Sequence, residues 1–380
     1  MTIGALTLAI MAIIMAVAIL NGFKKEITEK QRGFFGDIIL LKNDTNDSYV
    51  NSPISLSKEQ IANLENNPNI VDIYPFATKA GIMNVKLEVE GVLLKGIDQD
   101  YDQQFLSKTI LEGDTINFAA EDAENQLLIS SLTANRLNLK VGESFIMYFI
   151  QEPVRKRKFT VKGIFSTNSE ELDKVYVIGS LSLIRRLNNL TESEVGGYEV
   201  RVKDFNQLGV TTEQMNDALD NSMYATNVVM QMPDIFNWLN MLDMNDNIIF
   251  VLMVVVAVIN MISALLISIL ERSSMIGLLK ALGMQNKRIR TVFLYNSLYL
   301  IGYGLLLGNI FAILIYFFQT KTAFFKLDPS VYYVSFVPMD ISWITVLWLN
   351  VALVGIALIT LFIPSMLISR ISPIKTIQFK

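Results

Sequence analysis

Four long apolar runs without a charged residue limit what this chain can fold into more than any other feature. They cover residues 3–20, 248–270, 291–318 and 341–369 of the 380-residue sequence. A helix needs about 20 consecutive apolar residues to cross the hydrocarbon core of a membrane. The sequence therefore predicts an α-helical membrane protein with four transmembrane helices, at residues 1–21, 248–270, 291–318 and 341–369, and not a soluble protein with four buried helices.

The charged residues are concentrated between the first two runs. Residues 22–245 hold 22 of the 32 basic and 32 of the 36 acidic residues, a net charge of −10. Strand patterns of period two alternate there with amphipathic helical patterns, separated by turn residues. We expect a large α+β domain on stalk helices, split into two lobes near residues 100–125. The second stalk helix is expected to begin with Pro233 at its first position.

Short basic connections predict the orientation of the chain. Residues 271–290 carry five basic residues and one acid, and residues 370–380 carry three basic residues and no acid. Because cytoplasmic loops are enriched in Lys and Arg, both segments are expected inside and residues 22–245 outside. No basic residue precedes the first run, which favours a signal anchor over a cleavable signal peptide. Whether the native N-terminus is longer stays open.

Several kinds of chemistry are excluded by composition. The chain has no cysteine and no histidine, so a zinc site with the usual ligands, a thiol nucleophile and any His-based triad are absent. No Gly-Lys pair occurs, so the chain has no P-loop for the phosphates of ATP. We therefore expect a non-catalytic subunit without a metal or cofactor of its own and without a nucleic-acid partner.

Residues 271–290 are too short and too charged to cross a membrane, yet they contain a strongly apolar helical segment. Gly283 is placed as its C′ cap. Five apolar side chains follow one another at close spacing in this segment: Met275, Ile276, Leu278, Leu279 and Leu282. An apolar helix of this kind must bury its face, either in a groove of a partner protein or on the membrane surface.

A few polar or small residues interrupt the predicted spans. Polar groups inside a membrane hydrogen-bond to a neighbouring helix or line a cavity, and a GxxxG motif lets two helices approach closely. We expect one of these roles, helix packing or cavity lining, for Asn260, Asn296, Gly304, Gly308, Asn309 and Asn350.

The segment ERSSMIGLLKALG, residues 271–283, resembles the signature ER-x-x-E-I-G-x-L-K-A-L-G of the FtsX-like ABC permease domain, with Met275 in place of the usual Glu. In that family this segment is the coupling helix, which docks into a separate ATPase subunit. The resemblance therefore implies an ATPase-coupling role for Glu271, Arg272, Met275, Ile276, Gly277, Leu278, Leu279, Lys280, Leu282 and Gly283.

The rest of the chain resembles the same family. NRLNLKVGE (135–143) and YEVRV (198–202) are similar to the family's MacB-like periplasmic core domain, and LDPSVYYVSFVP (327–338) is similar to lipoprotein-releasing permeases of the LolC/LolE type. The resemblance implies three parts: a transmembrane helix at residues 1–21, a periplasmic α+β domain with stalk helices at 22–245, and an FtsX-like permease domain at 246–380.

The resemblance implies that the chain is a permease subunit in the bacterial inner (cytoplasmic) membrane. It would extract lipoproteins from the outer leaflet and pass them to a periplasmic carrier. The implied partners are an ABC ATPase subunit that binds ATP and Mg²⁺, a second permease copy or paralogue, the lipoprotein and the carrier. A MacB-like efflux permease and an FtsX-like signalling permease that transports nothing remain alternatives.

A hairpin is predicted between the strand patterns at 144–150 and 158–165, and its tip is the expected carrier contact. In the lipoprotein-releasing family a long hairpin hook of one permease reaches the carrier, whereas the connection here, residues 151–157, is short. The alternative is a solvated tip without a partner. The residues assigned to the contact combine apolar anchors with a basic run: Phe149, Ile150, Pro153, Val154, Arg155, Lys156 and Arg157.

Overall fold

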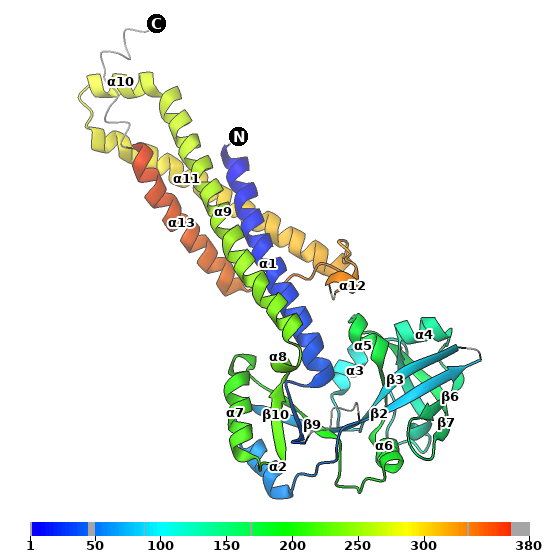
Figure 1. Cartoon of the computed structure of the whole chain (residues 1–380). Coiled ribbons are helices and arrows are strands. Elements are labelled where there is room, and N and C mark those ends of the chain that lie inside the picture. Colours follow the sequence, from blue (N-terminus) through cyan, green and yellow to red (C-terminus); the bar gives the residue numbers. More distant parts are fainter. Residues whose placement is uncertain (1, 45–49, 87, 168, 333, 366–380) are drawn as a thin grey trace. The chain divides into compact units, whose positions relative to one another are not determined.

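The computed structural model describes residues 2–44, 50–86, 88–167, 169–332 and 334–365. Contacts within the chain divide it into two compact units (Figure 1). The first unit contains Met1–Glu26, Asn237–Lys326 and Phe336–Lys380, and the second contains Ile27–Phe236 and Leu327–Ser335. Two helices contribute residues to both units: α1 (Thr2–Phe35) and α9 (Pro233–Glu271).

The first unit is helical. Besides parts of α1 and α9 it contains α10 (Ser273–Ala281), α11 (Asn286–Thr322) and α13 (Trp343–Ser365). Among the described residues, two helical segments are long and apolar enough to cross a membrane, Ile3–Phe35 and Leu298–Thr322, whereas Ile248–Asn260 and Trp343–Ile359 are shorter apolar stretches. Four spans therefore stay a prediction. The last residues of the predicted fourth span, 366–369, lie outside the described part of the chain.

The second unit is an α+β domain, as the sequence patterns predict. The described residues of this unit form ten strands: β1 (Ile38–Lys42), β2 (Ile70–Val85), β3 (Glu88–Ile97), β4 (Ile110–Gly113), β5 (Gln126–Ser130), β6 (Ser144–Phe149), β7 (Arg155–Phe165), β8 (Tyr176–Ser180), β9 (Gly197–Val202) and β10 (Met223–Asn227). The strand patterns in the sequence, at 37–42, 70–83, 84–97, 126–130, 144–150, 158–165, 174–179 and 197–203, predict eight of them and miss β4 and β10. β4 has four residues, and β10 has five, as many as the predicted strands β1, β5 and β8.

Six of the strands close into a ring. β2 pairs with β3, β3 with β8, β8 with β5, β5 with β7, β7 with β6, and β6 again with β2. Alternate side chains of these strands point inward and fill the barrel. Fully buried members of this core are Met83, Leu94, Leu127, Met147, Phe149, Phe159 and Val177.

The long strand β2 joins this barrel to a second, four-stranded sheet. Up to Phe76 it pairs with β9, and from Ala77 onward it pairs with β3. β9 in turn pairs with β1, and β1 with β10, so the second sheet combines the beginning and the end of the domain. The predicted division of the domain near residues 100–125 is therefore wrong, because the change of sheet lies within β2.

Short helices cover these sheets. They are α2 (Lys58–Glu65), α3 (Gln103–Thr109), α4 (Ser131–Leu137), α5 (Glu170–Val175), α6 (Leu181–Asn188), α7 (Leu208–Ala218) and α8 (Val228–Gln231), with single 3₁₀ turns at Ala123–Asn125 and Phe205–Gln207. The short helix α12 (Pro329–Tyr332) is also assigned to the second unit. Local signals explain several boundaries. Ser57 and Gln60 form a capping box at the start of α2, and Asn138 ends α4 in the left-handed conformation.

Candidate functional site

The segment predicted to couple to a partner forms α10, and its end is fixed by a glycine cap. Gly283 has a positive φ of 89°, which glycine adopts at little cost. Its N–H donates to the carbonyl of Lys280 at 3.0 Å, and the N–H of Met284 donates to the carbonyl of Leu279 at 2.9 Å. These two bonds are the Schellman motif, and they confirm the predicted C′ position of Gly283.

The apolar side chains of α10 divide between two environments. Ile276 is fully buried in a cluster of the first unit with Ile269, Ile289, Ile301 and Ala357, and Leu279 packs against this cluster. The prediction that the whole apolar face lacks a partner within the chain is therefore wrong for Ile276, and Gly277 is buried as well. Neither can be a contact residue on this surface.

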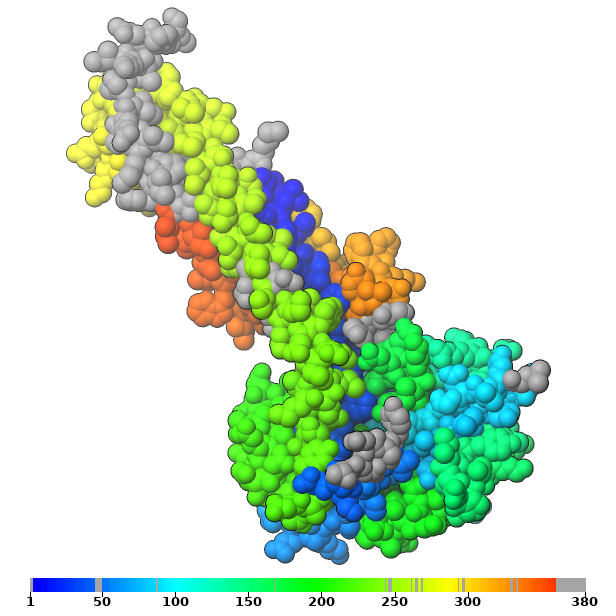
Figure 2. All heavy atoms as spheres, in the orientation of Figure 1, coloured from blue at the N-terminus to red at the C-terminus, as the bar shows by residue number. Residues whose placement is uncertain are grey.

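Three side chains of α10 form the surface that is left. Met275 is 41% exposed, Leu278 55% and Leu282 76%. Figure 2 shows spheres of this segment, in yellow, on the outside of its unit. Glu271 and Arg272 are also exposed at the start of the helix. Burial lowers the pKa of the Lys280 amine, and the positive charge of Arg290 acts in the same direction. We call Met275, Leu278 and Leu282 the α10 surface.

The predicted hairpin exists between β6 and β7, but its tip differs from the expected one. The strands are antiparallel, with Phe149 opposite Arg155, so the connection is residues 150–154. The basic run therefore belongs to the strand β7 and not to the tip, and Arg155 donates from Nη1 to the carbonyl of Arg186 at 3.2 Å. Phe149 is fully buried in the barrel beside Phe159, so its assignment as a contact residue is wrong.

What remains exposed at the hairpin is apolar with a basic border. Ile150 is 63% and Val154 67% exposed, and Pro153 is exposed between them. Residues opposite one another in a sheet share a face. On the outward face, Lys158 lies opposite Ile146, Ile146 opposite Asn84, and Asn84 opposite Val89. Ile146 and Val89 are both exposed, so the outer apolar surface of the hairpin continues onto its neighbouring strands.

The polar residues of the predicted spans have different surroundings. The side chains of Asn309 in α11 and Asn350 in α13 hydrogen-bond to each other in both directions, with N···O distances of 2.8 and 3.0 Å. Asn260 is exposed on α9, and the side chain of Asn296 lies outside the described ones. The packing role predicted for Asn309 therefore has a geometric basis, since the amide pair joins two helices.

Gly304 and Gly308 face α1 within the first unit. A Cβ atom added to Gly304 would lie 2.5 Å from Cδ2 of Leu6, and one added to Gly308 would lie 2.9 Å from Cβ of Ile10 and 3.2 Å from the carbonyl oxygen of Thr7. The absence of side chains is what allows α1 and α11 to approach this closely.

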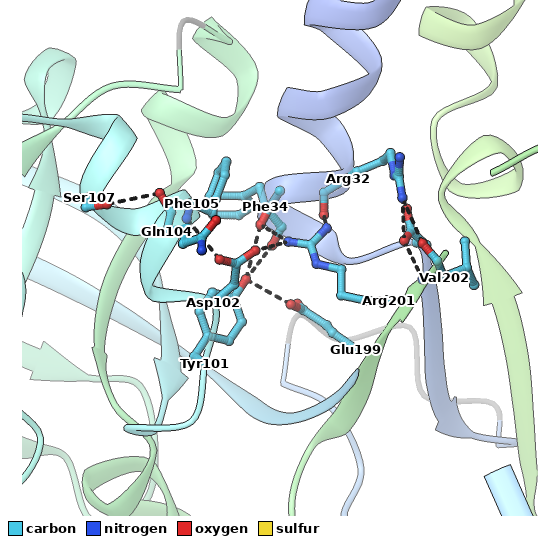
Figure 3. A network of polar contacts seen from close by, with 12 residues as sticks. Arg32, Phe34, Tyr101, Asp102, Gln104, Phe105, Ser107, Glu199, Arg201 and Val202 are labelled. Carbon is cyan, nitrogen blue, oxygen red and sulfur yellow. Dashed lines mark hydrogen bonds and ion pairs between the residues drawn. The ribbon is translucent and has the colours of Figure 1, made fainter. Parts of the chain in front are cut away.

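A polar network around the last turn of α1 is the site that the sequence patterns miss (Figure 3). Arg201 of β9 donates from Nη2 to the carbonyl of Gly33 at 3.0 Å and from Nη1 to the carbonyl of Arg32. Lys95 of β3 donates to the carbonyl of Phe34. Thus two cations, from two different strands, bind the carbonyl groups at the end of one helix.

Both cations are held by further partners. Lys95 forms an ion pair with Glu199, with 2.6 Å between Nζ and Oε1, and both side chains are buried. The hydroxyl of Tyr101 donates to the other carboxylate oxygen of Glu199 at 3.0 Å. Arg201 lies 3.3 Å from a carboxylate oxygen of Asp102. Burial lowers the pKa of Lys95, while Glu199 opposes this, and burial raises the pKa of Tyr101 well above its usual value.

A second ion pair fixes the turn after α1. Arg32 binds the buried carboxylate of Asp37 with two nitrogens, one at 3.0 Å, and donates to the carbonyl of Val202 at 3.1 Å. Asp37 also accepts the N–H of Val202 at 2.7 Å. The guanidinium of Arg32 lies 4.9 Å from the ring centre of Phe205. No sequence pattern could indicate this site, because hydrogen-bonded members such as Arg32 and Val202 are 170 residues apart.

The described residues contain no group of three or more Asp or Glu side chains able to hold a metal ion. The polar atoms of the network bind one another and helix carbonyls, which is an arrangement suited to holding a helix rather than to catalysis.

Two protein-family models together match most of the chain. The family model of the MacB-like periplasmic core domain matches residues 1–222, and that of the FtsX-like permease C-terminal region matches residues 247–373. Among curated proteins, the chain is 20% identical to the lipoprotein-releasing system transmembrane protein LolC of Neisseria meningitidis, over 100% of this chain and 93% of that protein. It is 21% identical to LolE of Haemophilus influenzae, over 98% and 92%.

Two solved structures match the chain in part. The extracellular domain of the noncanonic ABC-type transporter YknZ from Gram-positive bacteria is 16% identical, with a TM-score of 0.34, and covers 50% of this chain and 99% of that domain. The periplasmic region of MacB from Actinobacillus actinomycetemcomitans is also 16% identical, with a TM-score of 0.36, over 56% of this chain and 98% of that region.

Proposed function

Since the chain belongs to the family of permeases with a MacB-like periplasmic core domain and an FtsX-like permease region, we propose that it is the permease subunit of an ABC transporter that releases lipoproteins from the bacterial inner membrane. It takes lipoproteins from the outer leaflet and passes them to a periplasmic carrier. ATP is hydrolysed by a separate subunit, which also holds the Mg²⁺.

The α10 surface carries this proposal. The helix α10 and its C-cap expose Met275, Leu278 and Leu282, while the buried side chain of Ile276 packs the helix against its own unit. Exposed apolar side chains on a firmly packed helix are what a helix-in-groove contact requires. The groove belongs to the ATPase subunit in this proposal, and Arg272 lies beside the contact to pair with acidic groups at its rim.

The need for a partner ATPase and a carrier follows from the cargo. Each buried CH₂ group contributes about 0.8 kcal/mol to membrane binding, so the removal of several acyl chains requires ATP and an apolar receiver. The exposed tip residues Ile150, Pro153 and Val154 are the proposed carrier contact, with Lys156 and Lys158 beside them to speed association with an acidic partner. A second permease, a copy or a paralogue, completes the transporter.

Depletion of this protein tests the function. In cells without it, outer-membrane lipoproteins should accumulate in the inner membrane, and expression of the intact chain should restore their sorting. Lipoproteins that reach the outer membrane normally in depleted cells would contradict the proposal and support an export or signalling permease.

A further inference from the structure

We propose that Lys95 and Arg201 are positioning residues that hold the end of α1 to the outer domain, so that movement of α1 is transmitted to β3 and β9. This inference rests on the proposed function, in which ATP hydrolysis on one side of the membrane must act on cargo on the other. We call Lys95, Arg201 and the carbonyls of Arg32, Gly33 and Phe34 the α1 clamp.

The end of a helix needs partners of this kind. The last four carbonyl groups of an α-helix accept no hydrogen bond from a backbone N–H of the same helix, and the C-terminus carries a partial negative charge. α1 ends at Phe35, so the carbonyls of Arg32, Gly33 and Phe34 are three of these four groups. Lys95 and Arg201 bind all three. Charged donors form the stronger class of hydrogen bond.

The two cations also tie the helix to both sheets of the domain. Lys95 comes from β3 in the barrel, and Arg201 comes from β9 in the four-stranded sheet. Glu199, two residues before Arg201 on β9, binds Lys95 of β3, so the ion pair also joins these two strands to each other. A force on the end of α1 therefore reaches both sheets, through Lys95, which is buried, and through Arg201, which is partly buried and binds two helix carbonyls and Asp102. Side chains held by several partners have little freedom to move.

Packing against α3 also holds the last turn of α1 in place. A Cβ atom added to Gly33 would lie 2.0 Å from the ring of Phe105, so this ring lies directly on the backbone of α1. Phe34 is buried in a cluster with Ile97, Tyr101 and Leu106. The last turn of α1 is thus enclosed by the domain and is not a free end.

Hydrogen exchange on the full-length chain in lipid nanodiscs tests the clamp directly. The first variant, Lys95→Met with Glu199→Gln, removes the cation without leaving a buried unpaired charge. The second variant is Arg201→Met. In each, amides of residues 27–35 should exchange about tenfold faster or more, because hydrogen bonds from a charged donor are lost. Lys95→Arg, which keeps the cation, should restore slow exchange. Arg136→Met, at an exposed ion pair with Glu90, is the matched control.

A second measurement separates positioning from mere stability. In the reconstituted transporter, both variants should lose ATP-driven release of lipoprotein while the ATPase subunit still binds and hydrolyses ATP at the wild-type rate. Unchanged exchange of residues 27–35 in both variants would overturn the clamp. Faster exchange with undiminished release would overturn its role in transmission.

The two proposals can fail separately. If the intact transporter releases no lipoprotein, the proposed function is wrong, and the exchange measurement still decides the clamp because it needs neither ATP nor cargo. A general rise in exchange across β3, β9 and the barrel would show that the substitutions only unfold the domain, and this also counts against the clamp.

Discussion

Replacement of both exposed leucines of α10 should detach the ATPase subunit without unfolding the permease. Leu278 is 55% and Leu282 76% exposed, so together they offer slightly more than one leucine side chain of apolar surface for burial. Full burial of a leucine contributes about 1.5–3 kcal/mol. Loss of about 2–4 kcal/mol from the contact corresponds to a dissociation constant roughly 30- to 1000-fold higher.

The assay measures ATPase binding to the purified permease in detergent or nanodiscs. The double variant Leu278→Ala/Leu282→Ala should give the loss calculated above, and Leu278→Asp/Leu282→Asp should abolish binding because a carboxylate would enter an apolar groove. Thermal unfolding of the permease should be almost unchanged in the alanine variant, since exposed side chains contribute within about 0.5 kcal/mol to folding.

Ile276→Ala is the contrasting variant on the same helix. Its side chain is fully buried within the permease, so truncation should destabilise folding by about 2–5 kcal/mol. ATPase affinity of the folded fraction should change less than in the leucine variants. The reasoning is refuted if Leu278→Ala/Leu282→Ala binds the ATPase as tightly as the wild type, or if Ile276→Ala weakens binding without lowering stability.

Three further predictions concern other parts of the chain. Gly308→Val should lower the thermal stability of the solubilised permease by about 1–3 kcal/mol, because a side chain there collides with α1; Gly302→Val, where space is open, should not. Asn309→Leu should cost about 1 kcal/mol in the same melt through loss of the amide pair with α13, and no loss would mean that the pair contributes nothing. Replacement of Lys156 and Lys158 by Glu should slow carrier association in stopped-flow measurements at low salt, and a rate equal to the wild type would exclude steering by these lysines.

Much of the local structure was determined by the sequence itself. The segment from Ser144 to Phe149 is rich in apolar and aromatic residues and forms a strand, and Pro233 begins α9 because its missing N–H is not needed there. Gly283 ends α10 because few other residues adopt its positive φ. These features depend on residues within a few positions of one another, so a single sequence contains the information.

The pairing of strands was decided by the tertiary structure. The sequences of β4 (ILEG) and β10 (MYATN) contain no clear run of apolar or β-branched residues, and these segments become strands because they pair with β7 and β1. The same holds for β2, whose partner changes between Phe76 and Ala77 although nothing in its composition changes there. A run of apolar residues predicts a strand, but the neighbour it pairs with is set by the whole fold.

The sites divide in the same way. That α10 needs a partner for its apolar residues could be predicted from its sequence, but which of them face inward could not. The side chain of Ile276 is buried in a cluster with Ile289, Ile301 and Ala357, which come from other helices, whereas Leu282 is exposed. Lys95 and Arg201 resemble the exposed charges of any strand in the sequence. They bind the end of α1 only because folding brings β3 and β9 to the last turn of that helix, where its unpaired carbonyls need donors.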